Sequence, residues 1–89
     1  TFVVPFKVNF VLDGTNKYSI VTVSGVPEGV DPDDSTVKHA AEQQFVNALN
    51  SRMYLETYSP NQDHRNDYPI FRNLMKADTV EVISVERIE

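Results

Sequence analysis

The sequence predicts a single α+β domain spanning residues 1–89, in which a small sheet packs on one long helix as a two-layer sandwich. Two observations support this fold class: an alternating apolar segment followed by a turn near the N-terminus, and a helical stripe of apolar residues in the middle of the chain. The predicted order is a β-hairpin, the long amphipathic helix, a short second helix and a C-terminal strand.

The N-terminal hairpin rests on two strand patterns separated by a turn. Apolar side chains recur at every second position from Phe6 to Leu12, which is the period of a half-buried strand. The segment Asp13-Gly14-Thr15-Asn16 favours a tight turn, because these residue types tolerate the positive φ angles that such turns need. Residues 18–24, which are rich in β-branched side chains, form the second predicted strand.

The register of this hairpin stays open at the level of sequence. A four-residue loop would place Val21 and Val23 on the face of Phe6–Leu12. A loop of three or five residues would place Tyr18 and Ile20 there instead. A shift of one residue exchanges the two faces of a strand, so the choice decides which side chains enter the core.

One amphipathic helix is predicted from about residue 32 to about residue 50 or 52. Asp31 is suited to cap this helix and Pro32 to occupy its first position, and the acids that follow complement the positive end of the helix dipole. Apolar residues then recur at spacings of three and four, the pattern of one buried helix face. They are Val37, Ala40, Ala41, Phe45, Ala48, Leu49 and Met53.

The segment after the helix contains two short elements. Met53–Tyr58 is either a short strand or the frayed end of the helix, and residues 59–67 are predicted to form an exposed polar loop. Asp67-Tyr68-Pro69 is suited to cap a short second helix. That helix would turn Phe71, Leu74 and Met75 inward.

The C-terminal strand is predicted over Thr79–Ile88. Apolar side chains fall on both of its faces, which favours a central position in the sheet rather than an edge. These side chains are Val80, Val82, Ile83, Val85 and Ile88.

Composition excludes several classes of site and partner. The chain has no Cys, so disulfides, thiolate catalysis and cysteine-ligated metals are excluded, and a reducing compartment is favoured. Thirteen acids against 8 bases give a net charge of −5, and no two bases are adjacent, which disfavours nucleic acid and anionic membranes. No apolar stretch approaches the ~20 residues that span a bilayer. We expect a cytoplasmic protein, of the producing or host cell, that needs no cofactor.

The acidic segment from residue 28 to residue 34 is the first candidate site. It holds Glu28, Asp31, Asp33 and Asp34, which could dock a basic protein or weakly bind a hard cation such as Ca²⁺. The spacing does not match an EF-hand loop. Capping of the helix explains three of the four acids and is the favoured interpretation.

The two histidines are weaker candidates for chemistry. His64 lies between Asp63 and Asp67, an arrangement that could form a metal site or a general base, but an exposed polar loop is the favoured interpretation because no nucleophile or further ligand is evident. His39 and Gln43 are one helical turn apart, and Gln43 is a poor zinc ligand. His39 is therefore expected at the boundary of the core, and no catalytic or metal-binding residue is assigned.

Tyrosines form the last candidate surface. Tyr54 and Tyr58, together with Tyr18, Tyr68 and Phe2, could form a partly exposed aromatic surface, since tyrosine is favoured at protein interfaces. Burial of most of these rings in a small core is an equally weighted alternative.

These features favour a small non-enzymatic protein-binding module, an accessory or regulatory protein that acts through an acidic and aromatic surface and that could form a homodimer. In size, acidity and lack of cysteine the chain is similar in kind to small phage-encoded accessory proteins that bind and modify host machinery, and this likeness transfers no residues. Two alternatives remain. One is a nucleic-acid-binding domain that uses Phe6, Phe10 or Tyr18 on an open sheet face. The other is a metal-dependent enzyme that uses His64 with Asp63 and Asp67.

Overall fold

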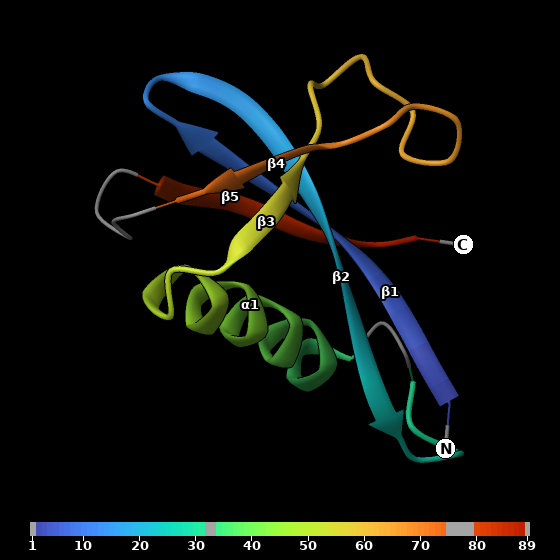
Figure 1. Ribbon diagram of the computed structural model, residues 1–89. Coiled ribbons are helices and arrows are strands. Elements are labelled where there is room, and N and C mark those ends of the chain that lie inside the picture. The colour runs from blue at the N-terminus through green and yellow to red at the C-terminus, as the bar shows by residue number, and fades with distance from the viewer. Residues whose placement is uncertain (1, 32–33, 75–79, 89) are drawn as a thin grey trace.

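The computed structural model describes residues 2–31, 34–74 and 80–88. These residues form one helix and five strands in two sheets (Figure 1). The elements are β1 (Phe2–Leu12), β2 (Thr15–Val26), α1 (Ser35–Asn50), β3 (Tyr54–Thr57), β4 (Ile70–Asn73) and β5 (Val80–Arg87). The larger sheet has the order β2-β1-β5, and β3 pairs with β4 in a separate two-stranded ribbon.

The β1–β2 hairpin turns more tightly than any of the loops considered from the sequence. Leu12 pairs with Thr15, so only Asp13 and Gly14 connect the strands. Their φ angles of 51° and 81° are both positive, as a type I′ turn requires. A two-residue loop has the same parity as a four-residue loop. Val21 therefore lies opposite Phe6 on the buried face.

The prediction that the C-terminal strand is central in the sheet was wrong. β1 is the central strand, and β5 pairs with β1 along one side only. The pairing passes from Asn9 with Ser84 to Phe10 with Val82, which leaves Ile83 as a bulged residue. The bulge shifts the alternation of side chains, so apolar residues reach both faces of an edge strand.

The helix begins later than predicted and uses a different cap. Asp34, not Asp31, is the N-cap of α1, and its carboxylate accepts a hydrogen bond of 2.8 Å from the backbone N–H of Thr36. This hydrogen bond lowers the pKa of Asp34 below its ordinary value. Pro32 and Asp33 lie outside the described residues.

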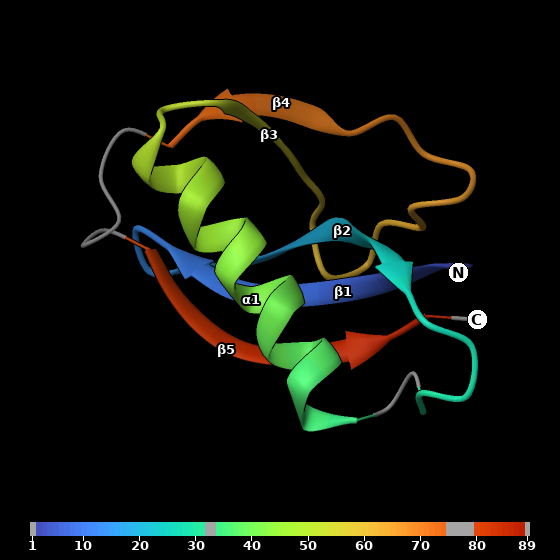
Figure 2. The same cartoon turned by 90° about the horizontal axis from the view of Figure 1, so that it is seen from below.

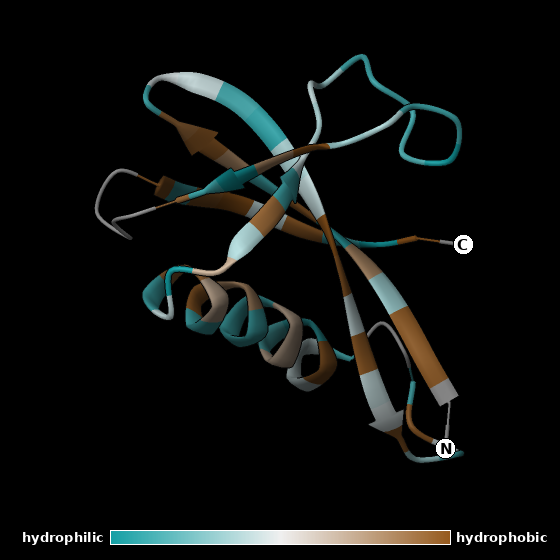
Figure 3. Ribbon diagram, viewed as in Figure 1, coloured by the Kyte–Doolittle hydropathy of each residue, from teal (hydrophilic) through white to brown (hydrophobic). Residues whose placement is uncertain are grey.

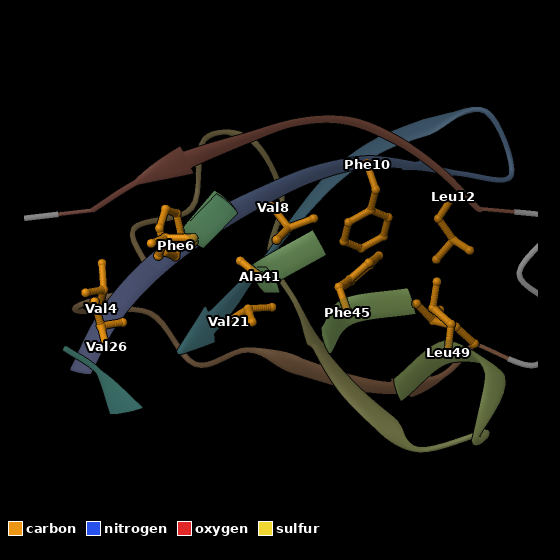
Figure 4. Packing of buried hydrophobic residues seen from close by; sticks show 12 residues of the cluster. Val4, Phe6, Val8, Phe10, Leu12, Val21, Val26, Ala41, Phe45 and Leu49 are labelled. Carbon is orange, nitrogen blue, oxygen red and sulfur yellow. The ribbon is translucent and has the colours of Figure 1, made fainter. Parts of the chain in front are cut away.

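The core forms where alternate side chains of β1 meet one face of α1 (Figure 4). The rings of Phe10 and Phe45 are in contact, with centroids 5.1 Å apart and planes tilted by 40°. Of the predicted helix stripe, Ala40 and Met53 are exposed, and Met53 lies beyond the end of α1. The buried residues of the two elements are Val4, Phe6, Val8, Phe10 and Leu12 on β1 and Val37, Ala41, Phe45 and Leu49 on α1.

The predicted short second helix was wrong, and so was the two-layer sandwich of one small sheet on the long helix, because the strands form two sheets. Residues 70–73 form β4, which pairs antiparallel with β3, and Phe71 is exposed rather than turned inward. A helix of one or two turns is marginal by itself, whereas the edge of β3 offers main-chain hydrogen bonds at once. The Thr57 hydroxyl adds a 2.8 Å hydrogen bond to the Ile70 carbonyl oxygen. Leu74 is buried as expected, and Met75 lies outside the described residues.

The contact between α1 and β1 predicts a large cost for truncating Phe45. We expect Phe45→Ala to lower the free energy of unfolding by about 3–5 kcal/mol, because it removes a fully buried ring and leaves a cavity. Gln43→Ala, at an exposed position of the same helix, is the matched control and should change it by less than about 0.5 kcal/mol. Urea unfolding followed by circular dichroism measures both. Equal effects of the two variants would contradict this account of the core.

The side chain of Ser19 gives a prediction of opposite sign. Ser19 is buried opposite Val8, and its hydroxyl has no hydrogen-bond partner among the described residues. An unsatisfied buried polar group is destabilising. We expect Ser19→Ala to raise the free energy of unfolding by about 1 kcal/mol, measured by the same urea titration. A loss of stability would show that the hydroxyl has a partner in solution.

Candidate protein-binding surface

The largest set of exposed apolar side chains gathers on the β3–β4 ribbon and the residues beside it. Their exposed fractions run from 57% to 91%, and all four residues of β4 are exposed. In Figure 3, brown segments mark apolar residues on both strands, whereas the loop between them is teal. We call this set the ribbon surface: Met53, Tyr54, Tyr68, Ile70 and Phe71.

The strand register places these side chains on both faces of the ribbon. Tyr54 pairs with Asn73 and Glu56 pairs with Phe71, so Tyr54 and Phe71 are diagonal neighbours on one face. Ile70 pairs with the buried Thr57 and therefore lies on the opposite face. A binding partner could therefore contact apolar side chains on either face of this ribbon.

Charged residues flank the ribbon surface in a pattern typical of protein interfaces. Arg52 precedes β3, Arg72 lies within β4, and both are exposed. Two acids lie close to this surface in the chain: Asp67, which is exposed, and Glu56 on β3, which is half-buried and accepts a 3.1 Å hydrogen bond from the Tyr58 hydroxyl. Tyr, Phe, Met and Arg are enriched at the centres of protein–protein interfaces, where Lys, Glu and Asp are depleted.

A cluster of rings attaches the ribbon to the main sheet. The rings of Tyr18 and Tyr58 stack with centroids 5.0 Å apart, and His64 lies edge-on to both at 6.4 and 6.5 Å. The backbones of the two tyrosines exchange hydrogen bonds of 2.9 and 2.8 Å. Lys7 Nζ lies 4.4 Å from the centroid of the Tyr18 ring. We call these four residues the tyrosine cluster.

Burial in this cluster raises the pKa of both phenols. Desolvation is the main cause for Tyr18, and the nearby Asp63 and Asp67 carboxylates add to it. For Tyr58, desolvation together with the Glu56 carboxylate raises the pKa to about 12. The raised pKa keeps both phenols protonated at pH values where an exposed tyrosine ionises, and each donates a hydrogen bond, Tyr18 to a main-chain carbonyl oxygen and Tyr58 to Glu56.

Gln62 fixes the loop that leads from β3 to β4. Its main-chain carbonyl oxygen accepts a hydrogen bond from the Tyr18 hydroxyl. Its side-chain oxygen accepts from the Ser59 N–H at 2.9 Å, and its side-chain amide donates to the Tyr68 carbonyl oxygen at 2.7 Å. One residue thus links the tyrosine cluster to Tyr68, at the entry to β4.

The carboxylates beside His64 are occupied in local turns. The Asp63 carboxylate accepts hydrogen bonds from Arg65 N–H at 2.9 Å and Asn66 Nδ2 at 2.8 Å, and the first of these is the main cause of its lowered pKa. The Asp67 carboxylate accepts from Asp63 N–H at 2.8 Å. Within residues 2–31, 34–74 and 80–88, no three His, Asp or Glu side chains converge in a way that could hold a metal ion.

The acidic segment lies far from the ribbon surface. Glu28, Asp31 and Asp34 are exposed and precede α1, whereas Tyr54 follows its other end. The 16 residues of α1 separate these ends by about 24 Å. Asp33 lies outside the described residues. The acids and the exposed aromatics therefore form two separate surfaces rather than one.

The remaining aromatic candidates are distributed between surface and core. Tyr54 is exposed, but Tyr58 is buried in the tyrosine cluster. The rings required for an aromatic sheet face, those of Phe6, Phe10 and Tyr18, are all buried.

Sequence reasoning missed the exposure of Ile70 and Phe71. The β-propensity of this adjacent pair, directly after Pro69, was the available signal for a strand.

A groove between α1 and β5 is the second feature that the sequence did not indicate. Its volume is about 350 Å³, and His39 lies on its helix wall. His39 is exposed rather than half-buried at the boundary of the core. The pairing of an edge strand with a helix wall could not be found from sequence, because the wall and the strand are about 40 residues apart in the chain.

Comparison with known proteins provides no relative for this chain. It matches no protein-family model, no curated protein and no solved structure. Among the helices that the structure describes, none has the length and apolar character needed to cross a membrane. The interpretation of function therefore depends on the surfaces described above.

The raised pKa of Tyr58 predicts a loss of stability at high pH. An unfolded tyrosine ionises near pH 10, whereas Tyr58 in the folded protein stays protonated to about pH 12. The unfolded state therefore loses its proton first, and the free energy of unfolding should fall as the pH rises from 10 to 12. Tyr58→Phe should reduce this fall, measured by urea unfolding at several pH values. Tyr68→Phe, at a position that is 91% exposed, is the control and should leave the fall unchanged.

Proposed function

We propose that this protein is a small non-enzymatic binding module, with an accessory or regulatory role, that recognises another protein through the ribbon surface. The exposure of five large apolar side chains on and beside one two-stranded ribbon is the observation that carries this proposal. Exposed apolar groups gathered in this way mark interaction sites, because leaving them in water is unfavourable.

The size of the surface supports a protein partner. Large apolar and aromatic side chains each cover about 150–250 Å², and these five are between 57% and 91% exposed, so together they present roughly 700 Å² to solvent. One side of a standard protein–protein interface covers about 800 Å². Because these side chains lie on both faces of the ribbon, a partner would have to pack around β4 to cover most of this area, and Arg52 and Arg72 are suited to the rim of such a contact.

A second copy of the chain is the other occupant that this surface would accept. A homodimer through β4 would bury the same residues in both copies. Sedimentation equilibrium between micromolar and millimolar concentration separates the two forms of the proposal. A monomer over this range leaves the surface to a different protein, and the lack of cysteine suits a partner in the cytoplasm.

The test is affinity capture with three versions of the tagged protein. The wild type should retain a protein in stoichiometric amount from lysate of the source cell. The double variant Tyr54→Ser/Phe71→Ser should reduce that retention at least tenfold, because it removes two exposed rings that are diagonal neighbours on one face of the ribbon. Val3→Ser, an exposed apolar residue on β1 outside the ribbon surface, is the matched control and should retain the wild-type amount.

A charge-reversed variant, Glu28→Lys/Asp31→Lys, separates the two candidate surfaces. Retention should be unchanged if the ribbon surface makes the contact. Loss of the partner in this variant, with retention in the ribbon variant, would assign binding to the acidic segment and overturn the proposal. Circular dichroism of every variant checks that the fold is intact.

A further inference from the structure

The outer edge of β5 is able to accept another strand. β5 pairs with β1 on one side, and within the described part of the chain no strand lies on its other side. The Ile88 N–H donates to the Pro5 carbonyl oxygen at 3.0 Å, so this residue faces β1. Main-chain groups of successive residues point to opposite edges of a strand, so residues an odd number of positions apart face opposite edges. The N–H and C=O of Val85, three residues earlier, therefore face the outer edge, where an added strand would reach them.

The groove of about 350 Å³ runs along this edge. Its strand side is formed by residues 82–85, and its helix side by residues in the first half of α1. Figure 2 shows α1 crossing the sheet over β5. The Ile83 side chain is 58% exposed there. The helix wall carries Lys38 and Glu42, and so presents both signs of charge. An extended segment in this groove would hydrogen-bond to β5 and lie against α1.

The two faces of β5 differ in charge. Val80, Val82 and Val85 pair with Leu12, Phe10 and Val8, whose side chains are buried beneath α1. Glu81 and Glu86 pair with Val11 and Lys7 on the face away from the helix. Lys7 is directed toward the Tyr18 ring on β2, at 4.4 Å from its centroid, and thus away from β5. The face of β5 that points away from α1 therefore carries the negative charge of Glu81 and Glu86.

This charge pattern disfavours a second copy as the added strand. In antiparallel self-pairing that uses the whole strand, Val82 of one copy would lie opposite Val85 of the other, on the helix side. The same register places Glu81 of one copy opposite Glu86 of the other, and the two-fold axis repeats this contact. Like charges in directly opposed positions destabilise a strand pair, whereas opposite charges stabilise it.

We propose that the groove between α1 and β5 binds an extended segment of another protein by β-strand addition, and that this segment alternates apolar with basic residues. The apolar side chains lie beneath α1 beside Val82 and Val85, and the Lys or Arg side chains lie on the other face beside Glu81 and Glu86. This surface is separate from the ribbon surface, and its occupation does not depend on the function proposed above.

The test uses the full chain and three octapeptides whose ends are acetylated and amidated. The first alternates Val with Lys, the second has the same four Val and four Lys in two blocks, and the third alternates Val with Glu. The alternating Val–Lys peptide is titrated into the protein, and the backbone amide signals are followed by NMR. We expect shifts in β5, above all at Val85, and in the first half of α1. The block peptide has the same charge but not the period of a strand. The block and Val–Glu peptides should each bind at least tenfold more weakly.

Two variants assign the result to the two surfaces. Glu81→Lys/Glu86→Lys, at exposed positions, should reverse the preference in favour of the Val–Glu peptide. Tyr54→Ser/Phe71→Ser should bind the Val–Lys peptide as the wild type does, which keeps this outcome independent of the ribbon surface. The proposal is overturned if the alternating and block peptides bind equally, if none of the peptides binds, if the shifts fall on β3 and β4, or if β5 amides become protected at high protein concentration without peptide.

Discussion

The packing of β1 against α1 is the interaction on which the rest of the structure depends. β1 is the central strand of the larger sheet, and five of its alternate side chains are buried against the helix face that contains Phe45. β2 and β5 are held in place through β1, because each pairs with it along one edge. The same contact sets the direction of α1, and so separates the acidic segment at one end of the helix from the ribbon surface at the other.

The ribbon is attached to this core in a different way. Leu55 packs at the margin of the core, and Leu74, directly after β4, is buried in it. The stacked Tyr18 and Tyr58, their backbone hydrogen bonds and the hydrogen bond from the Tyr18 hydroxyl to Gln62 also connect it to the main sheet. Because the ribbon is attached at these points, both faces of β4 remain exposed. Its large apolar side chains therefore stay in contact with water instead of packing into the core. A position at the margin of the core makes these groups accessible to a partner.

The two proposed binding surfaces use different physical means. The ribbon surface offers apolar area and aromatic rings, so under the proposal its selectivity would come from shape and from pockets in the partner that fit these rings. The groove beside β5 offers main-chain hydrogen bonds, which any extended segment could use, and its selectivity comes from the negative charge of Glu81 and Glu86. A single chain of 89 residues could thus hold two partners, or two parts of one partner, on opposite sides of the helix.

The sequence by itself determined the elements whose pattern is local and complete. The alternation from Phe6 to Leu12, the turn at Asp13-Gly14 and the helix stripe around Phe45 each contain their own hydrophobic period, and the structure has a strand, a turn and a helix at these places. Only the tertiary structure decided the elements that depend on a distant partner. Ile70 and Phe71 form a strand because β3 lies beside them, and the bulge at Ile83 depends on the register with β1. Whether an apolar side chain is buried or exposed depends on what packs over it, and in this chain the covering segments lie far away in the sequence.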